Sequence, residues 1–365
     1  MLSRRTMLLA GAAALTAPVA YAQEAPTVSA QGRALYADAL VVDGNLYPPI
    51  REGMTKEDVA RFKAAGLTAL KASIGGFGDS YRSTRDEIAR LDRIIDHFPT
   101  DFMRILRADD FAAAKRAGKL GIIYSFEGVA CLDGRVDRID EFAGHGVKVM
   151  QLSYNLPSPF GAGVLSDAAL GLTDLGREAV ARMNALGVAV DLSHANPATT
   201  AGAMQASTKP VLMTHGGCSA VHAHPRNKSD EQLRALAQMG GVFGIYDLPY
   251  LTPSPRQPAL DDYMRHMTHA LNVCGDDHVG IGSDADYFFF DTSPEAMAQF
   301  EQFLEQRRSA GVAAPGEDRP MYVEGLNHAR RCETIADALL TRGYSARVAE
   351  KVLGQNFIRA FTEIW

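Results

Sequence analysis

Eight short apolar runs, each followed by a segment with helical periodicity, constrain the fold of this chain more than any other feature. The intervening segments, such as "KEDVARFKAAG" and "TRDEIARLDRIIDHF", carry apolar residues at three- and four-residue steps, and several end at Gly, as amphipathic helices do. Eight repeats of strand and helix are typical of a (β/α)8 barrel. The eight runs are "ALVVD" to Asp43, "LTALKAS" to Ser73, "GIIYSFE" to Glu127, "VKVMQLS" to Ser153, "VAVDLSH" to His194, "PVLMTH" to His215, "GGVFGIY" to Tyr246 and "HVGIGSD" to Asp284.

We therefore expect an α/β fold, a (β/α)8 TIM-type barrel to which the segment from about Asp291 onward adds C-terminal helices. No Pro/Ser-rich linker divides residues 23–365, so we interpret them as a single domain. A doubly wound open sheet is the alternative. The net charge of -6 disfavours a nucleic-acid or anionic-membrane surface.

The N-terminus "MLSRRTMLLAGAAALTAPVAYAQEAP" has the composition of an export signal: two arginines, an apolar run, then small residues. The apolar run is shorter than the roughly 20 residues that span a bilayer. We therefore expect residues 1–22 to be cleaved near Ala22, leaving a periplasmic or secreted protein without a stable membrane anchor. "SRRTMLL" resembles a twin-arginine signal, and an ordinary Sec signal is the alternative.

Four of the runs end in residues suited to binding metal or moving protons: Glu127, His194, His215 and Asp284. A lone histidine after a strand is more often a hydrogen-bonded structural residue. In a barrel, however, strand ends meet at one mouth, and the fifth and sixth runs would place His194 and His215 side by side, with Glu127 reaching across. Two imidazoles and a carboxylate are the ligands of a catalytic zinc site, and Asp284 would take a proton from the water. The four cysteines form no CxxC pair and are not predicted ligands.

The surroundings of these residues resemble the membrane (renal) dipeptidase family of zinc hydrolases, which have a barrel fold. The resemblance extends from about Ala39 nearly to the C-terminus. The matching stretches are "FEGV", "GLTDLGREAVARMNALGVAVDLSH", "KPVLMTHGGCSAV", "HPRNKSDEQLRALAQMGGVFGI", "HVGIGSDAD" and "LLTRGYSARVAEKVLGQNFIRAF".

This resemblance implies a metal held by Glu127, His194 and His215, with Asp284 as the acid/base. It also implies that Arg226 binds the carboxylate of the substrate, which a guanidinium fork matches well. Without the resemblance, we would interpret Arg226 as part of a surface salt bridge. The nearby His222 and His224 are interpreted as pocket wall or surface rather than as ligands.

The chain departs from the family pattern at three positions. Family members carry His-x-Asp after the first strand, and this pair binds a second metal together with the bridging glutamate; here the aligned residues are Asn45 and Tyr47. Both are poor zinc ligands, so we expect about one Zn²⁺ per chain and a degenerate second site. Restoring the pair by Asn45→His and Tyr47→Asp should restore the second ion. Where the family has a histidine facing the substrate, this chain has Tyr154, a candidate substrate-binding residue.

Asp43, at the same corner, could shift to become a ligand. A residue at this point in a turn more often braces the loop through backbone N–H groups.

The leading hypothesis is an exported metal-dependent hydrolase that cleaves dipeptides or similar small amides with a metal-activated water. One alternative is a non-peptidase reaction on a modified peptide or small acid in periplasmic maturation, because a fold does not fix its chemistry. Another is a metal-retaining pseudoenzyme, although the retained ligands and Asp284 argue against complete loss of activity. A homodimer is one of the assemblies considered, and the sequence does not select among them.

Export should depend on the arginine pair if the signal is of the twin-arginine type. Replacing Arg4 and Arg5 with Lys should then leave the chain in the cytoplasm, as measured by cell fractionation and immunoblotting. Unaffected export of this variant would point to the Sec route.

Overall fold

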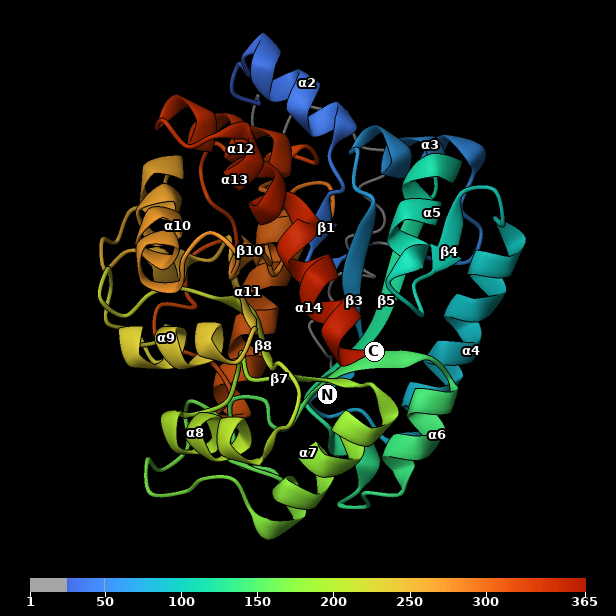
Figure 1. Ribbon diagram of the computed structural model, residues 1–365, viewed down its shortest axis with the longest axis vertical. Coiled ribbons are helices and arrows are strands. Elements are labelled where there is room, and N and C mark those ends of the chain that lie inside the picture. Colours follow the sequence, from blue (N-terminus) through green and yellow to red (C-terminus); the bar gives the residue numbers. More distant parts are fainter. Residues whose placement is uncertain (1–24, 49) are drawn as a thin grey trace.

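A closed barrel of parallel strands forms the centre of the computed structural model, which describes residues 25–48 and 50–365 (Figure 1). The predicted export signal at residues 1–22 lies outside these described residues. The ring runs β3-β1-β10-β9-β8-β7-β6-β5 and closes because β5 pairs with β3. Each predicted run overlaps one of these strands, which confirms the (β/α)8 barrel. The barrel strands are β1 (Val42–Asp43), β3 (Ala69–Gly76), β5 (Leu120–Glu127), β6 (Val147–Gln151), β7 (Ala189–Asp191), β8 (Leu212–Gly216), β9 (Val242–Ile245) and β10 (Val279–Ile281).

Three short strands that the periodicity did not predict extend this sheet or lie beside it. β4 (Phe102–Arg104) pairs with the first half of β5. β2 (Leu46–Tyr47) pairs with β11 (Ala285–Asp286) beyond the end of the barrel. This second pairing ties the loop after β1 to the loop after β10, so that two strand-end segments far apart in sequence lie together.

Helices alternate with the strands, and local capping residues fix their ends. Thr55 and Asp58 form a capping box at the start of α3, and Gly187, with a φ of 62°, ends α7 in the left-handed conformation. None of the helices in residues 25–48 and 50–365 is long and apolar enough to cross a membrane. The helices that accompany the strands are α2 (Ala30–Asp38), α3 (Lys56–Ala64), α4 (Tyr81–His97), α5 (Asp109–Ala117), α6 (Arg138–Gly144), α7 (Asp174–Leu186), α8 (Pro197–Ala206), α9 (Asp230–Gln238) and α10 (Leu260–Cys274).

The segment after Asp291 adds helices, as expected from the sequence. They are α11 (Pro294–Ser309), α12 (Arg331–Thr341), α13 (Ala346–Glu350), the π-helical turn η5 (Lys351–Gln355) and α14 (Asn356–Ile364).

Helix α14, red in Figure 1, packs against the N-terminal part of the barrel. Its Phe357 and Phe361 belong to a buried cluster with apolar residues from the beginnings of several barrel strands. A Cβ on Gly44 or Gly280 would lie 2.5 or 2.6 Å from the ring of Phe357. The ring therefore requires glycine at both positions, and α14 fills the bottom of the barrel, which leaves the opposite mouth for chemistry.

Removing the ring of Phe357 should destabilise the protein because it leaves a cavity at the bottom of the barrel. We expect Phe357→Ala to lower the free energy of unfolding by about 3–5 kcal/mol, measured by urea denaturation and far-UV circular dichroism. Leu106→Ala is the control, since Leu106 is 46% exposed, and it should change stability by about 0.5 kcal/mol or less. Equal urea midpoints for the two variants would contradict this role of α14.

Candidate metal centre and substrate site

Three potential metal ligands converge at the mouth of the barrel. Glu127 is the last residue of β5, His194 follows β7, and His215 lies within β8, and all three side chains are buried. The Oε1 atom of Glu127 lies 3.3 Å from Nε2 of His194 and 3.3 Å from Nε2 of His215. Their ligand atoms all lie within 4.8 Å of one another. The structure thus brings together the three side chains that the sequence singled out.

Asn155, after β6, orients the ring of His194. The amide Nδ2 of Asn155 donates to the carbonyl of Val312 at 2.8 Å, so its Oδ1 faces Nδ1 of His194 at 2.7 Å. Nδ1 of His194 therefore carries the hydrogen, and the lone pair is on Nε2, the atom that faces Glu127.

Thr214 orients the ring of His215 in a similar way. Its hydroxyl donates to Oδ2 of Asp191 at 2.6 Å and lies 3.1 Å from Nδ1 of His215. Because the hydroxyl hydrogen is used on Asp191, the oxygen accepts from Nδ1, and the lone pair of this ring is also on Nε2. A carboxylate-hydroxyl-imidazole series thus supports the candidate ligand, as the partners of metal-bound histidines commonly do.

The resulting donor set fits one divalent ion. Two imidazole nitrogens and one carboxylate oxygen meet with their lone pairs directed at the same small volume, and their mutual repulsion favours a cation there. Neutral imidazoles with an anionic oxygen suit zinc and similar ions, and three protein ligands leave a coordination position for water or substrate.

Glu127 also contacts two side chains of the loop after β1. The hydroxyl of Tyr47 donates to Oε2 at 2.7 Å, and Nδ2 of Asn45 approaches Oε1 at 3.4 Å. The two residues at which the sequence analysis expected a degenerate second metal site, Asn45 and Tyr47, therefore present hydrogen-bond donors to Glu127.

Asp284 lies three residues beyond β10, with a φ of 51° in the left-handed region, which non-glycine residues seldom adopt. Two hydrogen bonds to Asn45 hold it there. The backbone N–H of Asp284 donates to the carbonyl of Asn45 at 2.7 Å, and Nδ2 of Asn45 donates to Oδ1 of Asp284 at 3.0 Å. The β2–β11 pairing continues the same contact, so the loops after the first and eighth barrel strands form one unit.

Asp43 braces these loops rather than pointing to the candidate ligands, as expected for its place in the turn. Its Oδ1 accepts the backbone N–H groups of Asn45 and Ser283, and its Oδ2 accepts the Ser283 hydroxyl. Burial raises the pKa of Asp43 to about 6, although these hydrogen bonds oppose the increase.

Arg226 reaches the centre from the loop after β8. One guanidinium nitrogen donates to the carbonyl of Ser193 at 2.5 Å, and the other lies 3.1 Å from Nε2 of His194. Beside it, Lys228 holds the turn that carries His194 through the carbonyls of Leu192 and Ala195. Burial, followed by the charge of Arg226, lowers the pKa of Lys228 to about 7.

The ring of Tyr154 stacks on the candidate ligand His194, with ring centroids 4.2 Å apart. It also stacks on the ring of Phe77, with centroids 5.7 Å apart. Tyr154 therefore lies directly beside the candidate metal centre. His224 stacks on Tyr250 at 4.5 Å and bonds to the carbonyl of Pro315, away from the three candidate ligands, which agrees with its interpretation as pocket wall.

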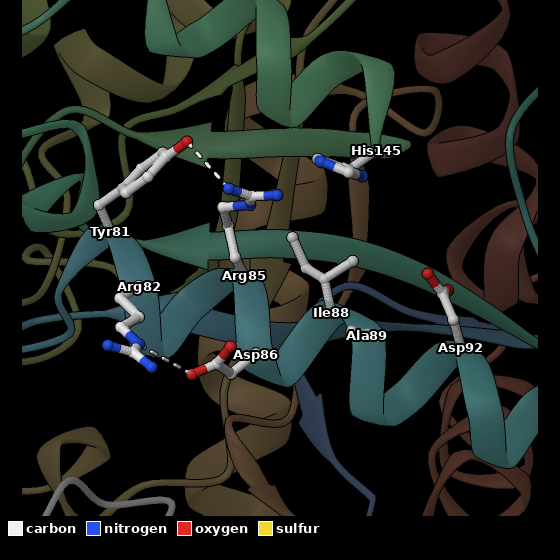
Figure 2. Close-up of a pocket in the computed structure, with 8 residues that line it drawn as sticks. All are labelled: Tyr81, Arg82, Arg85, Asp86, Ile88, Ala89, Asp92 and His145. Atoms are coloured by element: carbon white, nitrogen blue, oxygen red, sulfur yellow. Dashed lines mark hydrogen bonds and ion pairs between the residues drawn. The ribbon is translucent and has the colours of Figure 1, made fainter.

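A separate hollow of about 620 Å³ lies along the outer face of α4, and Figure 2 shows its lining. Arg82 and Asp86 form an ion pair there, and the side chains of Arg85 and Tyr81 contact each other. None of the candidate metal ligands lines this hollow, so it is separate from the candidate metal centre.

Four residues that the sequence analysis missed support the centre: Lys71, Asn155, Thr214 and Lys228. Asn155 and Thr214 act by orienting other side chains, and ordinary loop or strand positions give no signal for that. Lys71 did have a signal, because "TALKAS" places a lysine inside a strand whose other residues are mostly buried and apolar.

Comparisons with known proteins place this chain among the membrane dipeptidases. The sequence model of the family described as "Membrane dipeptidase (Peptidase family M19)" matches residues 33–306. The dipeptidase tcpJ of Claviceps purpurea is 28% identical over 288 residues, which are 78% of this chain and 60% of that protein. An uncharacterized protein in the pqqA 5' region of Klebsiella pneumoniae is 26% identical over 79% of this chain and 98% of its own length.

Solved structures agree. An amidohydrolase from Pseudomonas aeruginosa superposes with a TM-score of 0.80 at 27% identity and covers 92% of this chain and 99% of its own. A metallo peptidase from Rhodobacter sphaeroides, liganded with a phosphinate mimic of the dipeptide L-Ala-D-Ala, has a TM-score of 0.72 at 19% identity over 90% of this chain and 100% of its own. The second likeness concerns the fold alone. With the family match spanning most of the barrel, this chain belongs to the membrane dipeptidase family, peptidase family M19.

Proposed function

We propose that this chain is an exported metal-dependent hydrolase that cleaves dipeptides or similar small amides with one zinc ion per chain. The observation that carries the proposal is the convergence of Glu127, His194 and His215, whose ligand atoms all lie within 4.8 Å of one another. Family membership supports a hydrolytic reaction, and the two arginines near the N-terminus support export followed by cleavage near Ala22.

The three ligands would hold an ion that polarises the scissile carbonyl and lowers the pKa of the attacking water to about 7. Asp284 is the proposed acid/base: it accepts the proton of that water and returns it to the leaving amine. Its left-handed backbone and its two bonds to Asn45 fix the position of the carboxylate before substrate arrives.

Arg226 is the proposed binding group for the substrate carboxylate. Its guanidinium donates to Nε2 of His194, the nitrogen that would bind the ion, so that contact must be given up when the ion is bound. The N–H group of Arg226 that is released in this way would be available to a carboxylate on the bound substrate. A dipeptide with a free C-terminus has both a scissile amide for the ion and a carboxylate for Arg226.

A second candidate comes from the altered wall of the pocket. Tyr154 covers one face of His194, and Tyr47 covers one oxygen of Glu127. A pocket with this wall also suits a non-peptidase reaction on a modified peptide or small acid in periplasmic maturation, which comparison of turnover on free and modified dipeptides would distinguish.

Purified protein should contain about one zinc ion per chain, because three good ligands converge at one point. His194→Ala and His215→Ala should each reduce the content to near zero, as measured by inductively coupled plasma mass spectrometry after dialysis. His222→Ala is the control and should keep the ion. Unchanged stoichiometry in both ligand variants would rule out this assignment.

Arg226→Lys should weaken recognition of a free C-terminal carboxylate, because an ammonium cannot make the bidentate contact. We expect kcat/KM for a dipeptide to fall by about 10- to 100-fold, the value of one charged hydrogen bond, while kcat/KM for the C-terminal amide changes little. If the preference for the free carboxylate is retained, Arg226 does not bind that group.

A further inference from the structure

A buried lysine, Lys71, donates to Asn45, one of the two residues that the resemblance aligns with a second-metal ligand pair. We propose that Lys71 replaces this second cation: its ammonium excludes a second ion and holds Asn45 in the orientation that positions Asp284. This inference deepens the proposed function and rests on it, since it concerns the same site.

Lys71 lies on β3 with no solvent exposure, and its Nζ has two well-defined acceptors. It donates to Oδ1 of Asn45 at 2.9 Å and to Oγ of Ser125 at 3.2 Å. The Ser125 hydroxyl in turn donates to the carbonyl of Ala72, so its oxygen is an acceptor for Lys71. The ammonium is thus held in one place by groups whose own hydrogens are used elsewhere.

These contacts decide which way the amide of Asn45 points. Oδ1 receives hydrogen bonds from Lys71 and, at 3.3 Å, from Ser73. Nδ2 therefore faces the two carboxylates, Asp284 at 3.0 Å and Glu127 at 3.4 Å. An amide binds a metal ion through its oxygen, and here that oxygen is turned away from both carboxylates. The second metal does not fit the side chains present.

Tyr47 completes the same arrangement, because its hydroxyl donates to Oε2 of Glu127, the oxygen that a bridging glutamate would give to a second ion. Thus Asn45 and Tyr47 both direct hydrogen-bond donors at Glu127, and the ammonium of Lys71 contacts the other end of the Asn45 amide. A divalent ion placed among them would face like-charge repulsion in a water-poor environment.

The same lysine acts on Asp284 through Asn45 and is therefore a positioning residue. Asn45 holds Asp284 by its side-chain N–H and by its backbone carbonyl. Without Lys71 the amide could turn over and present Oδ1 to the carboxylate, which would repel it. The positive charge that a second ion would contribute near the two carboxylates is here provided by the protein.

The inference is tested by restoring the family's ligand pair with and without the lysine. We compare the wild type, Asn45→His/Tyr47→Asp, and the triple variant that adds Lys71→Met, each titrated with Zn²⁺ and with Co²⁺ in equilibrium dialysis. The sequence alone predicted that the double variant would regain the second ion, but with Lys71 in place we now expect it to hold about one ion per chain. The triple variant should take up a second ion at least tenfold more tightly, with the visible spectrum of Co²⁺ reporting the new ligands.

Two matched variants separate charge from packing in the double-variant background. Lys71→Arg keeps the positive charge and should remain at one ion, and Ser125→Ala keeps Lys71 and should remain there as well. Equal second-ion affinity in the double and triple variants would overturn the inference while leaving the single-metal proposal intact. A wild type that binds no ion would overturn both, and circular dichroism identifies any variant that fails to fold.

Discussion

The rest of the site depends on how the buried carboxylate of Glu127 is compensated by its neighbours. It is buried at the end of β5, and its two oxygens have separate sets of partners: Oε1 faces two imidazoles, and Oε2 accepts from Tyr47. A buried anion must be compensated, so neighbouring residues are constrained to be cations, metal ligands or hydrogen-bond donors. Tyr47 and Asn45 meet this demand on one side as hydrogen-bond donors, and Lys71 in turn donates to Asn45. His194 and His215 are arranged for an ion on the other side.

The barrel was predictable because its strands are buried on both faces and appear in the sequence as short apolar runs that alternate with segments of helical periodicity. The exact strand limits were not, since pairing sets them. The run "HVGIGSD" continues to Asp284, whereas β10 ends at Ile281 because the backbone then enters the left-handed turn. β2 and β11 are two residues long, and so short a strand has no detectable periodicity.

For the candidate site, the sequence was sufficient to single out side chains at strand ends that converge in the structure, Glu127 and the two histidines. It was insufficient where function depends on which end of a side chain faces which neighbour. That Asn45 offers its nitrogen and not its oxygen follows from Lys71, a residue on another strand. The substitutions at Asn45 and Tyr47 looked like the loss of a metal site, whereas the structure presents them as parts of a connected hydrogen-bond network.

The position of α14 also has a consequence for how the molecule is made. The rings of Phe357 and Phe361 fill a cavity whose walls come from strands as early in the chain as β1, so the barrel cannot be finished until α14 has left the ribosome. Until then the bottom of the barrel lacks the side chains of α14. Such a folding intermediate exposes apolar surface and strand edges to aggregation and proteolysis.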